Sequence, residues 1–188
     1  MIYCSSYGNK MSGAYMSPFE IFAQALGFVG AAIYVFSFQI RNVKKLFLMQ
    51  ALGAVFFTVH FLLLGAHTGA LQNSLSILRG IILLFRDRKW AKSRFTLAGL
   101  IILFIISGIV TYSGPLGLLP MVAMIVSTLA MWTGDGFKIR VTQLAATSPC
   151  WLIYNISVMS VSGILTESFN IISVIVSFIR YGKNYEGR

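Results

Sequence analysis

The chain has 188 residues, of which 57% are hydrophobic and 11% charged, and its formal net charge is +10. A soluble domain carries roughly 25% charged residues and must cover its core with polar surface. The composition, with a mean hydropathy of +0.79, therefore excludes a water-soluble globular protein and indicates a chain embedded in lipid. The apolar runs are continuous and do not alternate, so they predict membrane helices and not the strands of a barrel.

Seven apolar segments follow one another, each near the roughly 20 residues needed to cross the hydrocarbon core. They cover residues 19–40, 46–65, 68–85, 95–112, 115–133, 139–157 and 161–180. The third is the most polar, because it contains Gln72, Asn73 and Arg79. The sixth is interrupted by Gln143, Thr147, Ser148 and Pro149. Residues 1–17 are polar and small, without the apolar stretch of a signal peptide, so the first helix is expected to serve as the targeting signal.

Basic residues between these segments lie almost entirely on one side. Thirteen of the fifteen Lys and Arg fall there: Arg41, Lys44, Lys45, Arg86, Arg88, Lys89, Lys92, Arg94, Lys138, Arg140, Arg180, Lys183 and Arg188. The opposite side has only Lys10, and Arg79 lies inside the third segment. An excess of this kind marks the cytoplasmic side, which predicts an outside N-terminus and a cytoplasmic C-terminus. Because the basic residues are scattered between apolar segments and form no single stripe, they do not indicate a nucleic-acid-binding protein.

The third and seventh segments resemble each other at a constant offset of 94 residues. They share Gly69/Gly163, Leu71/Leu165, Ser74/Ser168, Ile77/Ile171, Ile81/Ile175 and Arg86/Arg180. At an offset of 90, Leu26-Gly27 matches Leu116-Gly117, and Phe47 matches Phe137. One extra span between two three-helix units leaves both units in the same orientation, which makes the repeat parallel.

The predicted fold is therefore an all-α integral membrane protein of seven transmembrane helices, built as two parallel three-helix repeats joined by a linker helix (3+1+3). The predicted division is a polar extracytoplasmic tail, a first repeat, a basic cytoplasmic loop with the linker helix, a second repeat and a cytoplasmic tail. These parts cover residues 1–17, 18–86, 87–113, 114–181 and 182–188.

Polar residues recur along single faces of the third and seventh segments, which predicts a polar, water-accessible cavity between the repeats. The candidate solute-binding residues are Asn73, Ser76, Arg79, Trp151, Asn155, Glu167, Asn170 and His60. Polar side chains in membrane bundles also serve simply to hydrogen-bond neighbouring helices. Trp151 is equally compatible with stacking on a sugar and with the aromatic belt at the membrane interface.

The ionisable candidates are the most informative, because a centred Arg costs roughly 2.5–3.5 kcal/mol on insertion scales. Helical side chains lean toward the helix N-terminus. Arg79 therefore leans away from the nearby cytoplasmic interface, which favours a cavity or ion-pair role over snorkelling. Glu167 leans toward the outer surface, so snorkelling and a cavity role remain equal alternatives. His60 has the chemistry of a proton carrier, but a single histidine near the end of a span more often forms an interfacial hydrogen bond.

Three stretches carry a resemblance to a known family: HFLLLGAHTGA at 60–70, LLPMVAMIVST at 118–128 and CWLIYN at 150–155. With them the chain resembles the YgjV-like bacterial inner-membrane family, from about residue 20 to residue 181. The 3+1+3 plan is also similar to that of the SWEET sugar facilitators and the wider MtN3/PQ-loop group. The chain departs from that group because it has no Pro-Gln dipeptide, and because Pro120 and Pro149 offer kinks in the second repeat only.

The resemblance implies a multi-pass protein of the bacterial inner membrane, but it supplies no binding or catalytic residues. The favoured function is a transporter or facilitator of a small polar solute, such as a sugar or related metabolite, by alternating access. The alternative is a non-transporting receptor or assembly protein. No paired carboxylates, metal ligands or activated nucleophile occur within the spans, so neither an enzyme nor a metal or cofactor is expected. The expected partners are the lipid bilayer and a small polar solute, and a homodimer is compatible with the sequence.

Overall fold

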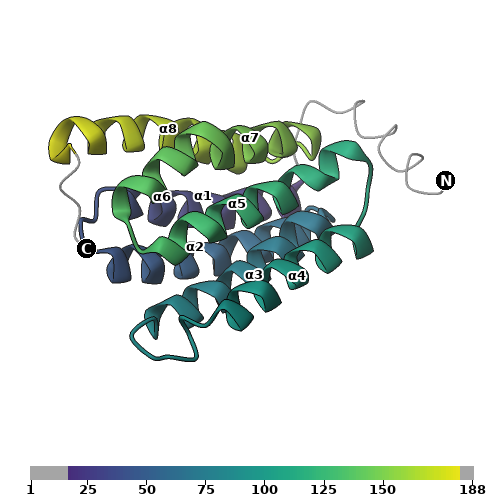
Figure 1. The fold of residues 1–188 in the computed structure, drawn as a ribbon. Helices are drawn as coiled ribbons and strands as arrows, with labels where there is room; N and C mark the ends of the chain where they lie inside the picture. The colour runs from purple at the N-terminus through teal and green to yellow at the C-terminus, as the bar shows by residue number, and fades with distance from the viewer. Residues whose placement is uncertain (1–16, 183–188) are drawn as a thin grey trace.

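The computed structural model describes residues 17–182, and all regular structure within that range is helical (Figure 1). The elements are α1 (Pro18–Ser37), α2 (Val43–Leu63), α3 (His67–Leu84), α4 (Arg94–Val110), a 3-10 turn η2 (Pro115–Leu118), α5 (Leu119–Thr133), α6 (Gly136–Thr142), a π-helical turn η3 (Gln143–Thr147), α7 (Ser148–Ser157) and α8 (Val161–Tyr181). They occupy all seven predicted segments, with α6, η3 and α7 together forming the sixth. The two predicted tails lie almost entirely outside the described residues.

Four of the described helical segments are long and apolar enough to cross a bilayer. They are α1, α2, the continuous segment η2–α5, and α8, while α4 is a shorter apolar helix. The remaining segments, α3 and α6–α7, are the two in which the sequence places polar residues, and their depth in the membrane stays a prediction.

Local sequence explains where several of these helices begin. Ser17 and Glu20 form a capping box at the start of α1, with Ser17 Oγ accepting from the Glu20 amide at 3.2 Å and Glu20 Oε2 accepting from the Ser17 amide at 3.0 Å. Asp135 caps α6 by accepting from the Phe137 amide at 2.9 Å. The preceding Gly134 has a φ of 67°, and this left-handed conformation in the turn between α5 and α6 favours glycine, which has no Cβ atom.

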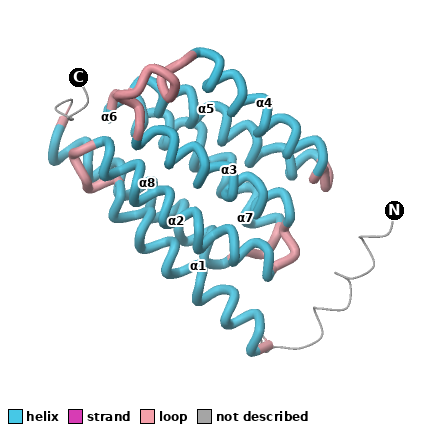
Figure 2. Tube along the Cα trace, turned by 90° about the horizontal axis from the view of Figure 1, so that it is seen from below, coloured by secondary structure: helices cyan, strands magenta, loops and turns pink. Residues whose placement is uncertain are grey.

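Six helical segments pack as a closed ring. Each neighbouring pair is in contact in the order α1, α2, α3, α5, α7 and α8, and α8 returns to contact α1. The short helix α6 and the turn η3 extend α7 and also pack on α5, while α4 lies outside the ring against α3 and α5 (Figures 1 and 2). The ring encloses a common interior to which side chains from both halves of the chain contribute.

The polarity of this ring is the reverse of that of a soluble protein. Large apolar side chains cover the outside, among them Ile109 at 63% exposed and Ile179 at 82% exposed. Many polar side chains are buried inside, including Gln50, Asn170 and Ser177. An apolar exterior of this extent is stable only against another apolar phase. The arrangement therefore suits a chain whose helices satisfy their own backbone groups and face lipid.

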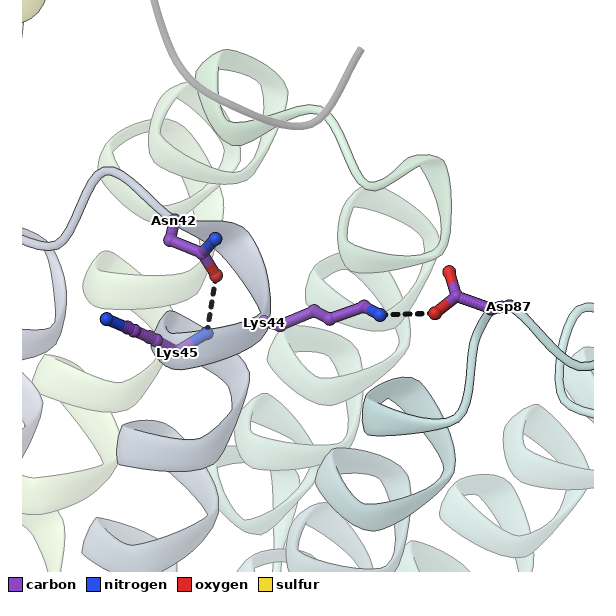
Figure 3. A network of polar contacts seen from close by, with 4 residues as sticks. All are labelled: Asn42, Lys44, Lys45 and Asp87. Carbon is purple, nitrogen blue, oxygen red and sulfur yellow. Dashed lines mark hydrogen bonds and ion pairs between the residues drawn. The ribbon is translucent and has the colours of Figure 1, made fainter.

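The predicted basic loops gather at one end of the bundle, where α1, α3, α5 and α8 end and α2, α4 and α6 begin (Figure 1). The Lys44 ammonium at the start of α2 forms an exposed ion pair with Asp87, which follows α3, while Asn42 accepts from the Lys45 amide at 3.1 Å (Figure 3). The hydrogen bond from Lys44 holds the pKa of Asp87 below its ordinary value. Exposed pairs of this kind contribute little to stability, so the pair mainly links two loops at this end.

Arg140, which the sequence analysis counted among the basic residues between the apolar segments, is not a surface loop residue. Its side chain is fully buried in α6. Nη2 donates to the carbonyl oxygens of Phe38 and Ile40, each at 2.8 Å, and Nε donates to Ser177 Oγ at 2.8 Å. Phe38 is the C-cap of α1, so the guanidinium satisfies carbonyl groups that no residue of α1 can satisfy. Its positive charge also lies at the negative end of that helix.

The turn between α7 and α8 contains one strained residue, Met159, whose φ of 54° is left-handed. This conformation costs a residue with a Cβ atom roughly 1–2 kcal/mol, and the 69% exposed side chain recovers little of it by burial. We expect Met159→Gly to relieve this strain and raise the free energy of unfolding by about 1 kcal/mol. The greater conformational entropy of glycine in the unfolded chain opposes part of this gain. A thermal melt in detergent measures this. Met159→Ala keeps the strain and is expected to show no gain, so equal stabilisation by both variants would refute the explanation.

Candidate functional site

A polar cavity of about 50 Å³ lies inside the ring. Its wall includes side chains from the first half of the chain, such as Tyr34, Asn73 and Arg79, and from the second half, such as Asn155 and Glu167. Pockets for small molecules commonly measure roughly 300–1,000 Å³. The cavity therefore has room for a few waters or for a very small solute.

Arg79 is buried in this wall, with 4% of its surface exposed. Its Nη1 donates to Ser127 Oγ at 2.7 Å and to Thr128 Oγ1 at 3.0 Å, both on α5, and its guanidinium carbon lies 5.9 Å from the centre of the Phe104 ring. Its Nε has no hydrogen-bonding partner. Among residues 17–182 no carboxylate lies within ion-pair distance of Arg79, so the charge is held by neutral hydroxyls and by an aromatic face.

Glu167 is the second charged group of the wall and is 8% exposed. Three donors converge on its Oε2: Ser148 Oγ at 2.7 Å, Asn170 Nδ2 at 3.3 Å and Gln143 Nε2 at 3.4 Å. The side chain therefore lies in the bundle interior and does not reach toward the outer surface. Within the described part of the chain, no donor reaches the other carboxylate oxygen, Oε1.

The π-helical turn η3 supplies part of this arrangement. Pro149 lacks an amide proton and its ring opposes a regular turn before it. The Ser148 amide donates to the Gln143 carbonyl, five residues back, so one extra residue is accommodated. Gln143 and Thr147, at the two ends of this turn, both line the cavity. The break predicted for the sixth segment is thus present and shapes the wall beside Glu167.

The remaining candidates fall into two groups. Asn73, Trp151, Asn155 and Asn170 line the cavity together with Arg79 and Glu167. Ser76 is buried just behind the wall, beside Tyr34, and is not a lining residue. The structure therefore gathers six of the eight predicted residues around one space.

His60 lies outside that wall, in a hydrogen-bonded cluster near the end of α2. Its Nδ1 donates to the Ala23 carbonyl at 2.7 Å, because a carbonyl oxygen can only accept. Its Nε2 lies 2.8 Å from Ser160 Oγ and 3.2 Å from Ser162 Oγ. The imidazole thus connects α1 and α2 to the start of α8, and its neighbours within residues 17–182 are structural groups of those helices.

Three aromatic rings separate the cavity from a wider opening. Phe61 and Trp151 line the cavity and stack at 5.8 Å between ring centres, and Tyr154 packs edge-on against Trp151 at 5.7 Å. Tyr154 also lines a second, more open space of about 900 Å³, bounded by the turns around 65–68, 110–117 and 157–158. The Tyr154 hydroxyl accepts from the Gly69 amide at 2.9 Å, which fixes the ring between the two spaces.

Sequence reasoning missed several residues that complete the site. Tyr34 lines the cavity from α1, and Ser127 holds Arg79 from α5. Ser127 and Thr128 form the only polar pair in the otherwise apolar run 118–131, which is a pattern that could have been noticed. Gln72, in contrast, faces outward to α4, where its Nε2 donates to the Phe104 carbonyl at 3.1 Å.

A helical ring with an apolar exterior and buried charged side chains, among them Arg79 and Glu167, defines a polytopic membrane protein with an internal cavity. The chain matches the family model Imp-YgjV, described as a bacterial inner membrane protein, over residues 21–185, and it belongs to that family. Inner membrane protein YgjV of Escherichia coli (strain K12) is 27% identical to it over 160 residues, which cover 85% of this chain and 84% of the relative. No solved structure is significantly similar to the chain.

Proposed function

We propose that this protein is a transporter or facilitator of a small polar solute, which works by alternating access between two three-helix repeats. The observation that carries the proposal is the polar cavity lined by side chains from both halves of the chain. Its two charged residues, Arg79 and Glu167, lie on α3 and α8, the helices that the sequence offset of 94 residues relates. Charged groups inside a membrane bundle are expensive and commonly mark a solute or ion pathway.

The packing order supports the parallel 3+1+3 arrangement. A two-fold axis along the membrane normal exchanges the first span with the fifth and the third with the seventh. It therefore converts the observed contact between α1 and α8 into the observed contact between α5 and α3. The second and sixth spans each pack between the other two helices of their unit, and α4 lies outside both units, as a linker would.

Hydrogen bonds join the two units at both ends of α1. At one end the Ser162 amide donates to Gln24 Oε1 at 3.0 Å, next to the His60 cluster. At the other end Gln39 Nε2 donates to Ser173 Oγ at 2.8 Å, next to Arg140. In an alternating-access cycle, one of these two sets of contacts would open while the other stays closed.

The orientation in the proposed cycle follows the basic residues. The end that contains Lys44 and Arg88 faces the cytoplasm of a bacterial cell, and the open space beside Tyr154 faces outward. Solute would enter through that space and reach the cavity when the rings of Tyr154, Trp151 and Phe61 move aside.

Uptake into proteoliposomes tests the proposal. Labelled sugars, nucleosides and small acids are screened with and without a pH gradient, using the wild type and Arg79→Ala. We expect saturable uptake of at least one solute and its loss in Arg79→Ala, because the mutant lacks the charge in the cavity. Arg88→Ala, which removes an exposed arginine outside the cavity, is the matched control and should transport normally.

A different result would favour the alternative function. If no solute moves but one of them raises the melting temperature of the detergent-solubilised protein, the chain is a binding protein that opens on one side only. If Arg79→Ala and Arg88→Ala lower uptake equally, the cavity is not the pathway.

A further inference from the structure

We propose that the solute is a small zwitterion, a molecule that carries one carboxylate and one ammonium group. This inference rests on the proposed site and names the chemical class that it takes. Its basis is the pair of opposite charges in one cavity, Arg79 and Glu167, each buried and neither neutralised by the other.

The wall formed by α3 and α5 is a carboxylate site. Arg79 offers an unpartnered Nε–H, and Ser127 and Thr128 hold its Nη1 in place. The planar fork of a guanidinium matches the two oxygens of a carboxylate. The neutral hydroxyls orient Arg79 without cancelling its charge, so the charge remains available to a solute.

The wall formed by η3, α7 and α8 is an ammonium site. All three donors to Glu167 reach Oε2, which leaves Oε1 as an acceptor. Three residues that line the same side each have a buried atom without a hydrogen-bonding partner: Thr147 Oγ1, Asn155 Oδ1 and Asn170 Oδ1. The Asn170 amide donates its Nδ2 hydrogen to Glu167, so the orientation that leaves Oδ1 as the unpartnered atom is fixed by that bond. An ammonium group has three hydrogens to donate and no acceptor, which this set of acceptors complements.

Charge balance separates a zwitterion from other solutes. A neutral sugar would leave both Arg79 and Glu167 buried without a counter-charge. A simple anion would pair with Arg79 but leave Glu167 unpaired, and a simple amine would pair with Glu167 but leave Arg79 unpaired. Burying an ion without a partner is costly, whereas a partner with good geometry offsets the lost hydration. A cavity of about 50 Å³ further restricts the solute to the smallest molecules of this class.

Uptake by the full-length protein in proteoliposomes tests the inference with five labelled probes. They are glycine, β-alanine, acetate, methylammonium and a neutral monosaccharide. We expect saturable uptake of glycine or β-alanine and little of the other three. Glu167→Gln and Arg79→Gln should each lower zwitterion uptake at least about tenfold, because each leaves one solute charge unpaired. Glu167→Gln should also shift the preference toward acetate, and Arg79→Gln should shift it toward methylammonium.

Thr147→Val tests the ammonium site even if the charge variants fail to fold. It replaces an unpartnered hydroxyl with a methyl of the same shape and keeps both charges. It should lower the affinity for the zwitterion a few-fold while leaving the melting temperature without solute unchanged. A wild-type affinity for the zwitterion in this variant would argue against the ammonium site.

The outcomes distinguish the solute class from the transport function. Wild-type uptake of the sugar, acetate or methylammonium in preference to both zwitterions overturns the solute class and leaves a transporter. Zwitterions that raise the melting temperature of the solubilised protein without uptake support the solute class and overturn transport. Absence of both uptake and stabilisation overturns both.

Discussion

Replacement of Arg140 by Ala is expected to destabilise the protein more than any other single change in the bundle. The variant loses the donors that reach Phe38, Ile40 and Ser177 and leaves buried carbonyl groups without partners. Hydrogen bonds from a charged group are each worth about 1.5–3 kcal/mol, so we expect a loss on the order of 3–5 kcal/mol. For a chain of this size that lowers the melting temperature by about 6–20 °C.

The matched control is Lys138→Ala, two residues earlier on the same helix and exposed. It removes the same charge from the same end of the bundle and should leave the melting temperature nearly unchanged. Thermal melts of both variants in one detergent give the comparison. Arg140→Lys should fall between wild type and Arg140→Ala, because an ammonium retains the charge but cannot reproduce the guanidinium fork. Equal effects of Arg140→Ala and Lys138→Ala would mean that α1 is held at this end by other contacts.

A single methyl group added at Gly27 is expected to separate α1 from α8. The new Cβ would lie 2.7 Å from Ser162 Cβ and 2.9 Å from His60 Nδ1, which are closer than packed atoms approach. Ser162 and His60 are themselves hydrogen-bonded at this position, so neither can move freely. We expect Gly27→Ala to cost about 1–3 kcal/mol in unfolding free energy, as overpacking commonly does.

Gly99 provides the opposite case in the same protein. It lies on α4 with open space around the position of a Cβ. Gly99→Ala should therefore stabilise its helix by up to about 1 kcal/mol, through the lower entropy of the unfolded chain. Melting temperatures that move in opposite directions for the two glycines would support the close packing of α1 on α8. A decrease of the same size in both would contradict it.

The helical segments could be predicted from the sequence because a helix that crosses the hydrocarbon core must be a long apolar run, and hydropathy measures this directly. The predicted 161–180 and the observed Val161–Tyr181 differ by one residue. The sixth segment was less accurate, since its helix begins at Gly136 and not at 139. The N-cap residue Asp135 marks that start, but a cap is polar and so lies outside the apolar run that was used to define the segment.

The sequence allowed a prediction of which residues belong to the site, but not of the contacts that they make. Polar residues in apolar segments identified Arg79 and Glu167, because such residues are too costly to retain without a role. The partners of Arg79 could not be deduced, since the hydroxyls of Ser127 and Thr128 lie 48 and 49 residues later, on α5. The burial of Arg140 was missed because a basic residue beside a turn has the same local sequence whether it faces water or caps another helix.

The distance in sequence between Arg79 and its hydroxyl partners has a consequence for biogenesis. A ribosome completes α3 well before it reaches Ser127 and Thr128 on α5. During that interval the guanidinium would enter hydrocarbon alone, at a cost of roughly 2.5–3.5 kcal/mol. α2 is apolar and packs closely on α3, so the two can enter the bilayer as a hairpin in which the apolar helix offsets the polar one. The hydrogen bonds from Arg79 to α5 can form only after α5 has been made, so this contact between the helices forms late although α3 is synthesised early.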